Sequence, residues 1–461
     1  MEISKNQCSK LLIGIIISLC TLIGIYFWIS IFFINHFYFG STINCFNVSG
    51  RTVEQADEQI SSEIESYSLK LEERGGEAEQ INGKDIDLKY NLDGKIQSFK
   101  DKQKPFAWIP GIFTSKDSKS SDIVNYDENL LKKSVDKLSC LDNNIVEPKN
   151  VSFKYTDKGY EIVDEVYGNK INKDALYESI KNAISNGEKT INLESANCYE
   201  NPKYTSKSKE AIDTKNLLND YVNTTITYNF GDKTEVLNGA TINNWLQVDD
   251  DLGVTFNEKE VKKYVDTLAS NYNTVGKPRD FVTTAGLKIK VSGGTYGWEI
   301  NKSEEVKDLI SLIKDKKSTT KEPLYSQKGI SHDLNDIGNT YVEINMTRQH
   351  LWFYKNGSLV TDGSVVTGNV SDGCGTPAGV YKLNYKERNA TLKGQGYSSP
   401  VSYWMPFNGG IGIHDANWRS VFGGNIYRTS GSHGCVNSPY SLAQSVYQSI
   451  DEGTPIVCYY E

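Results

Sequence analysis

The chain has 461 residues, a formal net charge of −8 and an aromatic content of 11%. This length allows about three domains of roughly 150 residues each. The acidic balance argues against a nucleic-acid-binding protein, which usually carries a basic patch, and the aromatic residues are numerous enough for sizeable packed cores.

The first expected element is a membrane helix. Leu11 to Ile34 form a run of 24 residues without a charge, longer than the ~20 residues that a helix needs to cross a bilayer. No small-residue cleavage site follows, which favours an uncleaved anchor over a signal peptide. Lys5 and Lys10 precede the run and place the N-terminus in the cytoplasm. We therefore expect residues 1–40 to be a cytoplasmic tail and a single-pass anchor in the cell membrane, with the remainder extracellular.

The middle of the chain repeats itself. VNYDENLLKKSVDKLS, Val124 to Ser139, matches VTFNEKEVKKYVDTLA, Val254 to Ala269. A second pair of similar segments begins at Tyr167 and Tyr296, at nearly the same offset. Two matches at one offset predict a duplicated structural unit.

Each copy mixes helical and strand patterns. Apolar residues recur at helical spacing in the matched segments, whereas Thr190–Glu194 and Leu287–Val291 alternate like half-buried strands. The copies therefore read as two α+β domains, residues 41–205 and 206–330.

Local signals refine this reading of the copies. Asn172 and Asn301 stand where helix N-caps are expected. The first copy carries an insertion, FKDKQKPFAWIPGIFTSKDSKSS at residues 99–121, whose Pro, Ser and Lys content predicts a surface loop.

The pattern changes to short alternating strands from about residue 335. Turns are expected at KNG, Lys355 to Gly357, and at TDG, Thr361 to Gly363. Ser438–Asp451 is the one clear helical pattern. Such a run of strands predicts a mostly-β domain over residues 335–461, folded as a sandwich or a partly closed barrel.

This last domain contains a candidate nucleophile, Cys435. A thiol of ordinary pKa needs a base or a positive environment to react, and that base must itself be oriented. His433 is too near along an extended segment to face the thiol, whereas His414, at a strand end, can approach it from across the site. Gly434 permits a tight turn that aims backbone N–H groups at an oxyanion.

Other readings of the cysteines are less well supported. The eight cysteines follow no disulfide spacing, and their pairing cannot be read from sequence. Neither CxxC nor HExxH occurs, which argues against a zinc site of those types. We expect the chain to use no metal and no cofactor. Cys435 taken alone is compatible with a buried structural cysteine, and Cys374 has no assigned role.

Three motifs together carry a family resemblance. His414, seventeen intervening residues and then SHGCVN, Ser432 to Asn437, resemble the signature of the L,D-transpeptidases with a YkuD-type catalytic domain. GTPAGVY, Gly375 to Tyr381, is similar to the TPxG segment of that family, and GGIGIHD, ending at Asp415, resembles its GxxxH strand.

The resemblance implies a role for each residue of these motifs. Cys435 would be the nucleophile, His414 the proton donor and acceptor, and Asp415 the residue whose backbone carbonyl orients the imidazole. Gly434 and Cys435 would furnish the oxyanion-hole N–H groups. The residues expected to shape the pocket and hold the substrate are Ser432, His433 and Asn437.

The resemblance also implies a reaction. Cys435 would attack the carbonyl of the third residue of a peptidoglycan tetrapeptide stem, expel D-Ala and pass the acyl group to a second stem as a 3–3 cross-link. Attack by water would instead give L,D-carboxypeptidase activity, and carbapenem-type β-lactams would acylate the same thiol.

The α+β copies resemble tandem peptidoglycan-binding domains, and a passive spacer is an equally weighted alternative for them. The alternative for the whole chain is a wall-binding scaffold whose enzyme domain has decayed.

Overall fold

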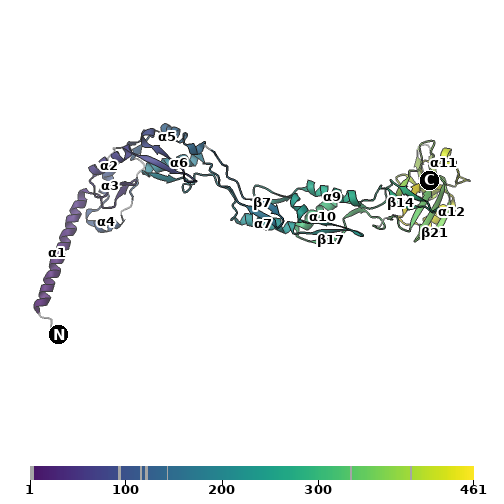
Figure 1. Cartoon of the computed structure of the whole chain (residues 1–461), viewed down its shortest axis with the longest axis horizontal. Coiled ribbons are helices and arrows are strands. Elements are labelled where there is room, and N and C mark those ends of the chain that lie inside the picture. Colours follow the sequence, from purple (N-terminus) through teal and green to yellow (C-terminus); the bar gives the residue numbers. More distant parts are fainter. Residues whose placement is uncertain are drawn as a thin grey trace. The chain divides into compact units, whose positions relative to one another are not determined.

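The chain folds into two compact units (Figure 1). Unit 1 comprises Met1–Phe153 and Ile162–Ala211, and unit 2 comprises Lys154–Glu161 and Ile212–Glu461. The structure is a computed structural model. It describes all residues except 1–4, 92–94, 115–116, 120–122, 143, 333–334 and 395–396.

Unit 1 begins with the long apolar helix α1, Lys5–Asn35. Its stretch Cys8–Asn35 has a mean hydropathy of 2.4 and is long and apolar enough to cross a membrane. The uncharged run expected to span the bilayer lies wholly inside this helix.

Both copies of the repeat build the same three-stranded sheet. In unit 1, β3 (Ser68–Glu72) pairs antiparallel with β4 (Ala78–Asn82) and parallel with β9 (Thr190–Asn192). In unit 2, the central strand likewise has one antiparallel and one parallel neighbour. The strands of this second sheet are β10 (Ile226–Phe230), β11 (Lys233–Leu237) and β17 (Thr319–Lys321). The predicted duplication is therefore confirmed by topology.

Amphipathic helices accompany each sheet and bury their apolar faces. They are α2 (Val53–Glu65), α5 (Glu128–Val135) and α6 (Lys173–Asn186) in the first copy, and α7 (Lys209–Val222), α9 (Glu258–Tyr272) and α10 (Lys302–Lys314) in the second. The two predicted N-caps are confirmed. Asn172 accepts a hydrogen bond from the Ala175 N–H at 3.0 Å, and Asn301 accepts one from the Glu304 N–H at 3.3 Å.

The copies differ in one connection. In the second copy, β12 (Leu246–Val248) and β13 (Val254–Phe256) are joined by a short turn. The corresponding strands of the first copy, β5 (Lys89–Tyr90) and β6 (Val124–Asn125), are separated by three helical elements. These are α3 (Lys95–Asp101), the 3₁₀ helix η2 (Pro105–Ala107) and α4 (Trp108–Thr114).

The expectation of a surface loop at residues 99–121 is therefore wrong for much of the insertion. Pro105 stands at the start of η2, where its fixed backbone angle favours a helical turn and its missing N–H costs nothing. The expected loop also covers residues 115–116 and 120–121, which lie outside the described part of the chain.

The C-terminal part of unit 2 is a sandwich of two sheets around one apolar core, as predicted. The first sheet has the order β21-β20-β19-β27-β22 and the second β23-β24-β25-β26. The core between them includes Phe353, Met405 and Ile413, all essentially buried.

The bounds of these strands are β19 (Tyr341–Asn345), β20 (His350–Lys355), β21 (Ser358–Ser364), β22 (Gly379–Lys382), β23 (Glu387–Gly394), β24 (Tyr397–Asn408), β25 (Ile411–Asp415), β26 (Val436–Ser438) and β27 (Pro455–Tyr459). The predicted helix is present as α12 (Tyr440–Ser449).

The remaining short elements are β1 (Thr42–Ile43), β2 (Phe46–Asn47), η1 (Gly83–Ile86), η3 (Ser139–Leu141), β7 (Ser152–Thr156), β8 (Gly159–Val163), α8 (Gly239–Ile242), η4 (Asn243–Trp245), β14 (Arg279–Val282), β15 (Lys288–Val291), β16 (Glu299–Ile300), β18 (Tyr325–Gln327) and α11 (Ile426–Thr429).

One of the two predicted turns in this domain is wrong. The KNG turn joins β20 to β21, with Asn356 and Gly357 both at positive φ, as a tight hairpin turn requires. The TDG segment instead continues β21, where Gly363 pairs with Leu351. Gly363 packs closely on α12, because a Cβ there would lie 3.1 Å from the side chain of Leu442, which would have to shift slightly.

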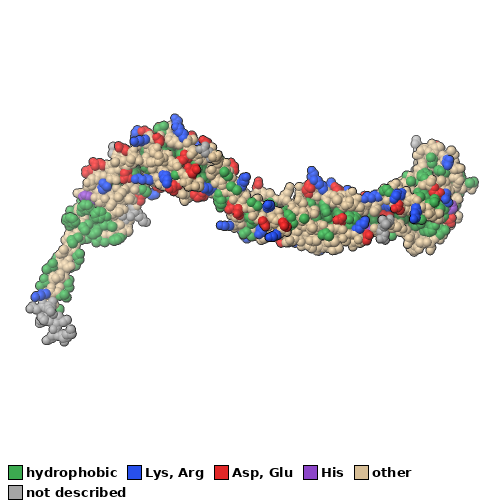
Figure 2. Space-filling model, in the orientation of Figure 1, with side chains coloured by type: hydrophobic (Ala, Val, Ile, Leu, Met, Phe, Trp, Pro, Cys, Tyr) green, Lys and Arg blue, Asp and Glu red, His purple; other side chains and the backbone are tan. Residues whose placement is uncertain are grey.

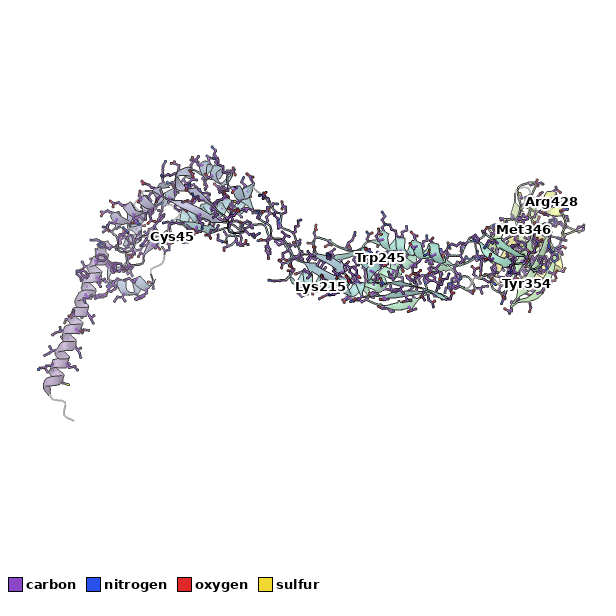
Figure 3. The ribbon with its side chains drawn as sticks, viewed as in Figure 1. Cys45, Lys215, Trp245, Met346, Tyr354 and Arg428 are labelled. Atoms are coloured by element: carbon purple, nitrogen blue, oxygen red, sulfur yellow. The ribbon has the colours of Figure 1, made fainter. Side chains whose placement is uncertain are left out.

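Within unit 2, the β14–β15 hairpin of the second copy packs on the sandwich. A buried ion pair joins Arg279 to Asp336 at 2.7 Å, and the Thr284 N–H donates to the Glu343 carboxylate at 2.9 Å. The Thr284 hydroxyl also meets the hydroxyl of Tyr354, labelled in Figure 3, at 2.9 Å. These contacts connect the hairpin to Asp336, Glu343 and Tyr354 of the C-terminal part of the chain.

Candidate active site

A cavity of about 530 Å³ opens in the sandwich, and five of the predicted site residues line it. These residues are His414, Ser432, His433, Cys435 and Asn437. A cavity of about 870 Å³ lies in unit 1, but its described lining contains neither a cysteine nor a histidine. Chemistry rather than size therefore identifies the candidate site.

Two adjacent strands bring the site together. β25 ends at Asp415, and it pairs in parallel with β26, so that His414 stands opposite Asn437. Cys435 immediately precedes β26. His414 and Cys435, which are 21 positions apart in sequence, therefore line one cavity.

His414 is held in a defined orientation and is only 2% exposed. Its Nδ1 lies 2.9 Å from the backbone oxygen of Asp415. Because a carbonyl oxygen only accepts hydrogen bonds, Nδ1 carries the proton and Nε2 presents a lone pair. Burial lowers the pKa of His414, and the charge of Arg419 acts in the same direction, against the raising effect of Asp415. The ring is therefore neutral at neutral pH.

The carboxylate of Asp415 has a different role from its carbonyl. One oxygen accepts hydrogen bonds from the backbone N–H groups of Ser402 and Tyr403, both at 2.8 Å. The other accepts one from the Asn417 amide at 3.1 Å. The side chain thus ties β24 to the end of β25, while the backbone carbonyl orients the imidazole.

Cys435 lies above a small apolar cluster formed by Ala390, Val401 and Trp404. Burial raises the pKa of the Cys435 thiol, and a hydrogen bond from the Gly412 backbone opposes this effect. The sulfur also lies 3.5 Å from the Gly410 carbonyl oxygen. The resting thiol is therefore protonated at neutral pH and requires a base when it attacks.

The turn before Cys435 is fixed by two hydroxyl groups. Gly434 has φ +117°, and a Cβ there would lie 3.0 Å from the Ile411 side chain, so glycine is required. Thr376 donates to the Gly434 carbonyl at 2.6 Å. Ser432 Oγ accepts the Gly434 N–H at 3.1 Å and donates to the Cys435 carbonyl. An oxyanion would therefore compete with Ser432 for the Gly434 N–H, whereas no such competitor is described for the Cys435 N–H.

Asn437 places a buried amide in the cavity wall. It is 2% exposed, and its Oδ1 has no hydrogen-bond partner among the described residues. A buried acceptor without a partner costs about 1–3 kcal/mol, and a substrate N–H would relieve that cost. His433, by contrast, is exposed at the cavity wall.

Among the lining residues that were not identified from the sequence, Trp418 and Arg419 have the largest side chains. Trp418 is 53% exposed, with its ring centre 5.8 Å from that of His414. Arg419 carries the only permanent charge among the described lining residues and donates from Nη1 to the Ser430 carbonyl at 2.9 Å. Both follow directly on the GIHD strand, and their position in this loop was the one signal available.

The cysteines are all free thiols in the structure. Cys374 is half-buried, with its sulfur 3.6 Å from the Asp372 carbonyl oxygen. It lies two residues before Thr376, which contacts the Gly434 turn. Nothing in the structure explains a thiol at this position.

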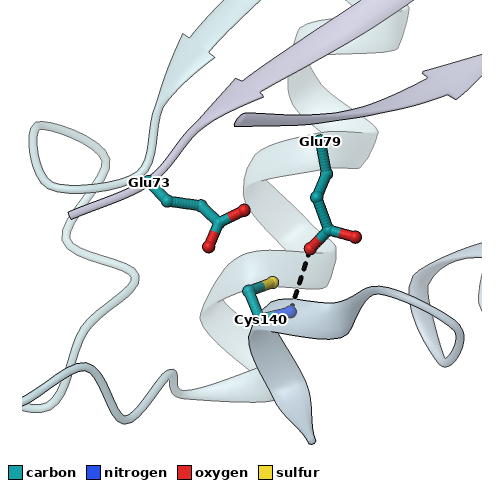
Figure 4. Close-up of side chains that lie close together, drawn as sticks. All are labelled: Glu73, Glu79 and Cys140. Carbon is teal, nitrogen blue, oxygen red and sulfur yellow. Dashed lines mark hydrogen bonds between the residues drawn. The ribbon is translucent and has the colours of Figure 1, made fainter. Parts of the chain in front are cut away.

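A second group of potential metal ligands lies in unit 1. One ligand atom each of Glu73, Glu79 and Cys140 lies within 4.8 Å of the others (Figure 4). However, the two oxygens of Glu79 already accept hydrogen bonds from the backbone N–H groups of Ser139 and Cys140, at 2.8 and 2.9 Å. These hydrogen bonds cap the N-terminal end of η3, so the cluster is explained by helix capping and not by metal binding.

Comparison with protein families gives two matches. Residues 339–458 match the YkuD model, an L,D-transpeptidase catalytic domain. Residues 79–192 and 204–321 each match a domain model described as peptidoglycan binding. The comparison with curated proteins gave no match.

Solved structures give further matches. A mutant of the Enterococcus faecium L,D-transpeptidase is 34% identical, with a TM-score of 0.45, and the match covers 54% of this chain and 100% of that one. The catalytic domain of the E. faecium enzyme acylated by ertapenem is 41% identical, with a TM-score of 0.25, over 26% of this chain and 97% of that one. An L,D-transpeptidase from Mycobacterium tuberculosis is 20% identical, with a TM-score of 0.24, over 26% of this chain and 57% of that one.

Proposed function

This chain belongs to the L,D-transpeptidase family, and from this premise we propose that it forms 3–3 peptidoglycan cross-links through an acyl-enzyme on Cys435. The observation that carries the proposal is the shared cavity, which is lined by the buried neutral imidazole of His414 on β25 and by the protonated thiol of Cys435 just before β26. The donor is a tetrapeptide stem, and the leaving group is its terminal D-Ala.

The first half-reaction transfers the stem to the enzyme. Nε2 of His414 takes the thiol proton as the sulfur of Cys435 attacks the carbonyl carbon of the third residue. The Cys435 N–H stabilises the oxyanion, and Gly434 contributes when its N–H leaves Ser432. When the intermediate collapses, the bond to D-Ala breaks, and His414 returns the proton to the departing nitrogen. The product is a thioester.

The second half-reaction reverses these roles. An amine of a neighbouring stem attacks the thioester carbonyl, and His414 takes a proton from the attacking nitrogen. The carbon–sulfur bond breaks, and the thiol regains its proton from His414. Asn437 offers its buried amide to the peptide backbone, and His433 borders the cavity. A carbapenem-type β-lactam would acylate the same sulfur through its ring carbonyl.

The localisation is part of the same proposal. α1 anchors the chain in the cell membrane with its N-terminus in the cytoplasm, and the rest of the chain faces the cell wall. We divide the chain into the anchor (1–40), two peptidoglycan-binding domains (41–205 and 206–330) and the catalytic domain (335–461).

A stem-peptide assay tests the reaction. Purified full-length chain is incubated with disaccharide-tetrapeptides, and the products are separated by mass. We expect dimers with the mass of two substrate molecules less one D-Ala. A predominance of disaccharide-tripeptides would instead show that hydrolysis dominates. Dimer formation that survives Cys435→Ala would contradict the proposed mechanism.

Binding by the repeats needs a separate assay. Full-length Cys435→Ala protein in detergent is mixed with purified sacculi, so that retention reflects binding without turnover. Retention no greater than that of an unrelated detergent-solubilised membrane protein would leave the two repeats as a spacer.

A further inference from the structure

The helical segment of residues 105–114, formed by η2 and α4, packs along α1. The ring of Trp108 lies 6.1 Å from that of Tyr26 and 6.0 Å from that of Phe33. The Tyr26 hydroxyl donates to the Phe106 carbonyl. We call residues 105–114 the apolar segment. It therefore contacts the part of α1 that is expected to lie in the membrane.

Polar contacts hold the apolar segment at the C-terminal end of α1. Lys100, which is 4% exposed, donates from Nζ to the Phe33 carbonyl at 2.8 Å, where the helix end carries partial negative charge. The Tyr38 N–H donates to the Gln103 side chain at 3.1 Å, and the Tyr38 hydroxyl donates to the Lys104 carbonyl. These contacts hold the residues just before the apolar segment beside the C-terminal end of α1.

The outer surface of the apolar segment is exposed and hydrophobic. Phe106, Ile109 and Phe113 are 53%, 47% and 85% exposed. Figure 2 shows hydrophobic side chains gathered where α4 meets α1. The Thr114 hydroxyl bonds back to the Pro110 carbonyl at 2.8 Å, which removes a free polar group from this surface. Contiguous apolar surface of this kind marks a contact with protein or membrane.

The depth of these contacts favours lipid. The uncharged run Leu11–Ile34 has its midpoint between Leu22 and Ile23. A hydrocarbon core about 30 Å thick then ends about ten residues later, near Phe33. Tyr26 lies seven residues before Phe33 in sequence, which is about 10 Å deeper in the bilayer at about 1.5 Å per residue. An element that touches both residues spans the depth typical of interfacial helices, about 5–10 Å.

The second copy of the repeat supports this reading by contrast. At the same connection it has only the turn Asp249–Gly253, whose Asp249, Asp250 and Asp251 are acidic. The apolar segment therefore occurs only in the copy adjacent to α1. Exposed Lys102 and Lys104 precede it, at the position where cationic side chains would meet lipid headgroups.

We infer that the apolar segment inserts into the outer leaflet beside α1 and forms a second membrane contact whose partner is lipid acyl chains. This inference rests on the proposed membrane anchoring by α1. The exposed apolar surface of the segment is continuous with that of α1, so we expect lipid to cover both. The first repeat is then seated on the bilayer surface, and α1 does not act as a flexible tether at its exit.

Photolabelling with lipid tests the inference on the intact chain. Full-length protein is reconstituted into phosphatidylcholine–phosphatidylglycerol vesicles that contain a phospholipid with a diazirine on its acyl chain. After irradiation, adducts are mapped by peptide mass spectrometry. We expect adducts on α1 and on the apolar segment. Ile145 and Val146, exposed in the same unit at 45% and 49%, are the internal control and should remain unlabelled.

A matched pair of variants sharpens the test. Phe113→Asp places a charge in the hydrocarbon region and should reduce adducts on the apolar segment roughly fivefold or more, with α1 labelling unchanged. Ile145→Asp should change neither. Labelling of α1 without the apolar segment, or equal labelling in Phe113→Asp, would overturn the inference while the anchor stands. Absence of labelling on α1 as well would overturn both the anchor and the inference.

Discussion

Cys140 and Cys435 each line a cavity, but the ionisable groups beside the two thiols differ. Cys140 borders a cavity of about 280 Å³ in unit 1 with Glu73, and Glu79 accepts its backbone N–H (Figure 4). Burial, followed by the hydrogen bond and charge of Glu79, raises the pKa of Cys140 to about 12. Cys435 shares its cavity with neutral His414, and the described lining there includes no carboxylate.

The comparison shows that the two thiols share the effect of burial and differ in the groups that surround them. Burial raises the pKa of both cysteines. The carboxylates beside Cys140 disfavour a thiolate further, whereas the Gly412 N–H beside Cys435 favours one and His414 can accept the proton. The account therefore predicts catalysis at one cavity and none at the other, and four changes test this difference.

The largest effect is expected from removal of the two thiols in turn. Cys435→Ala should reduce dimer formation by about 10⁴-fold or more, as removal of a nucleophile does in enzymes that form covalent intermediates. Cys140→Ala, the matched control, should leave the rate within about twofold, since residues that take no part in the reaction contribute little. The measurement is the initial rate with disaccharide-tetrapeptide. Equal losses in both variants would remove the distinction between the two cavities.

The next effect concerns the base. His414→Gln removes the group that accepts the thiol proton and should lower kcat by about 10²–10⁴-fold. Acylation of Cys435 by a carbapenem, followed by intact mass, should slow in parallel, because that step also requires deprotonation of the thiol. His433→Gln is the control, and a larger loss in this variant would assign the base to His433.

A smaller effect is expected at the non-catalytic thiol. Glu79→Gln removes the carboxylate that raises the pKa of Cys140, so its alkylation by iodoacetamide at mildly alkaline pH should accelerate. The same change weakens the cap of η3 and should lower the free energy of unfolding by about 1 kcal/mol. Peptide mass spectrometry measures the alkylation of Cys140, with Cys435 as the internal reference. An unchanged Cys140 rate would show that burial alone suppresses it.

The smallest effect is a shift in the pH profile. Turnover requires neutral His414, whose pKa burial lowers, so kcat/KM should hold as pH falls to 6.5 and decline only below its depressed pKa. Arg419→Gln removes a charge that also lowers this pKa, so the acidic limb should move to higher pH. Movement to lower pH would contradict the role assigned to Arg419.

The sequence motifs named five residues that the structure places in the lining of one cavity. The parallel pairing of β25 with β26 places His414 and Cys435 in one cavity lining, and this pairing was not predicted from the sequence. Trp418 and Arg419 were missed, because a loop after a strand does not reveal which side chains turn back to the cavity. The use of Ser432 within the turn, rather than toward the substrate, also depends on three-dimensional geometry.

The fold was predicted where local pattern decides it. The duplication, the caps at Asn172 and Asn301 and the mostly-β C-terminal domain follow from periodicity and capping chemistry. The prediction was wrong for the insertion in the first repeat, because its content of Pro and Lys is typical of a surface loop. The apolar residues of this insertion pack against α1, where Phe106 contacts Tyr26, 80 positions away in sequence. Local composition does not reveal a packing partner at that distance.

The most direct test of the account is to trap the acyl-enzyme. Full-length chain is mixed with disaccharide-tetrapeptide whose side-chain amine is acetylated, so that no acceptor amine is present. The mixture is quenched in acid and digested, and each cysteine-containing peptide is weighed. The account predicts the mass of the stem less D-Ala on the peptide that carries Cys435, with Cys140 and Cys374 unmodified. Release of D-Ala while Cys435 stays unmodified, or a thioester on another cysteine, would contradict it.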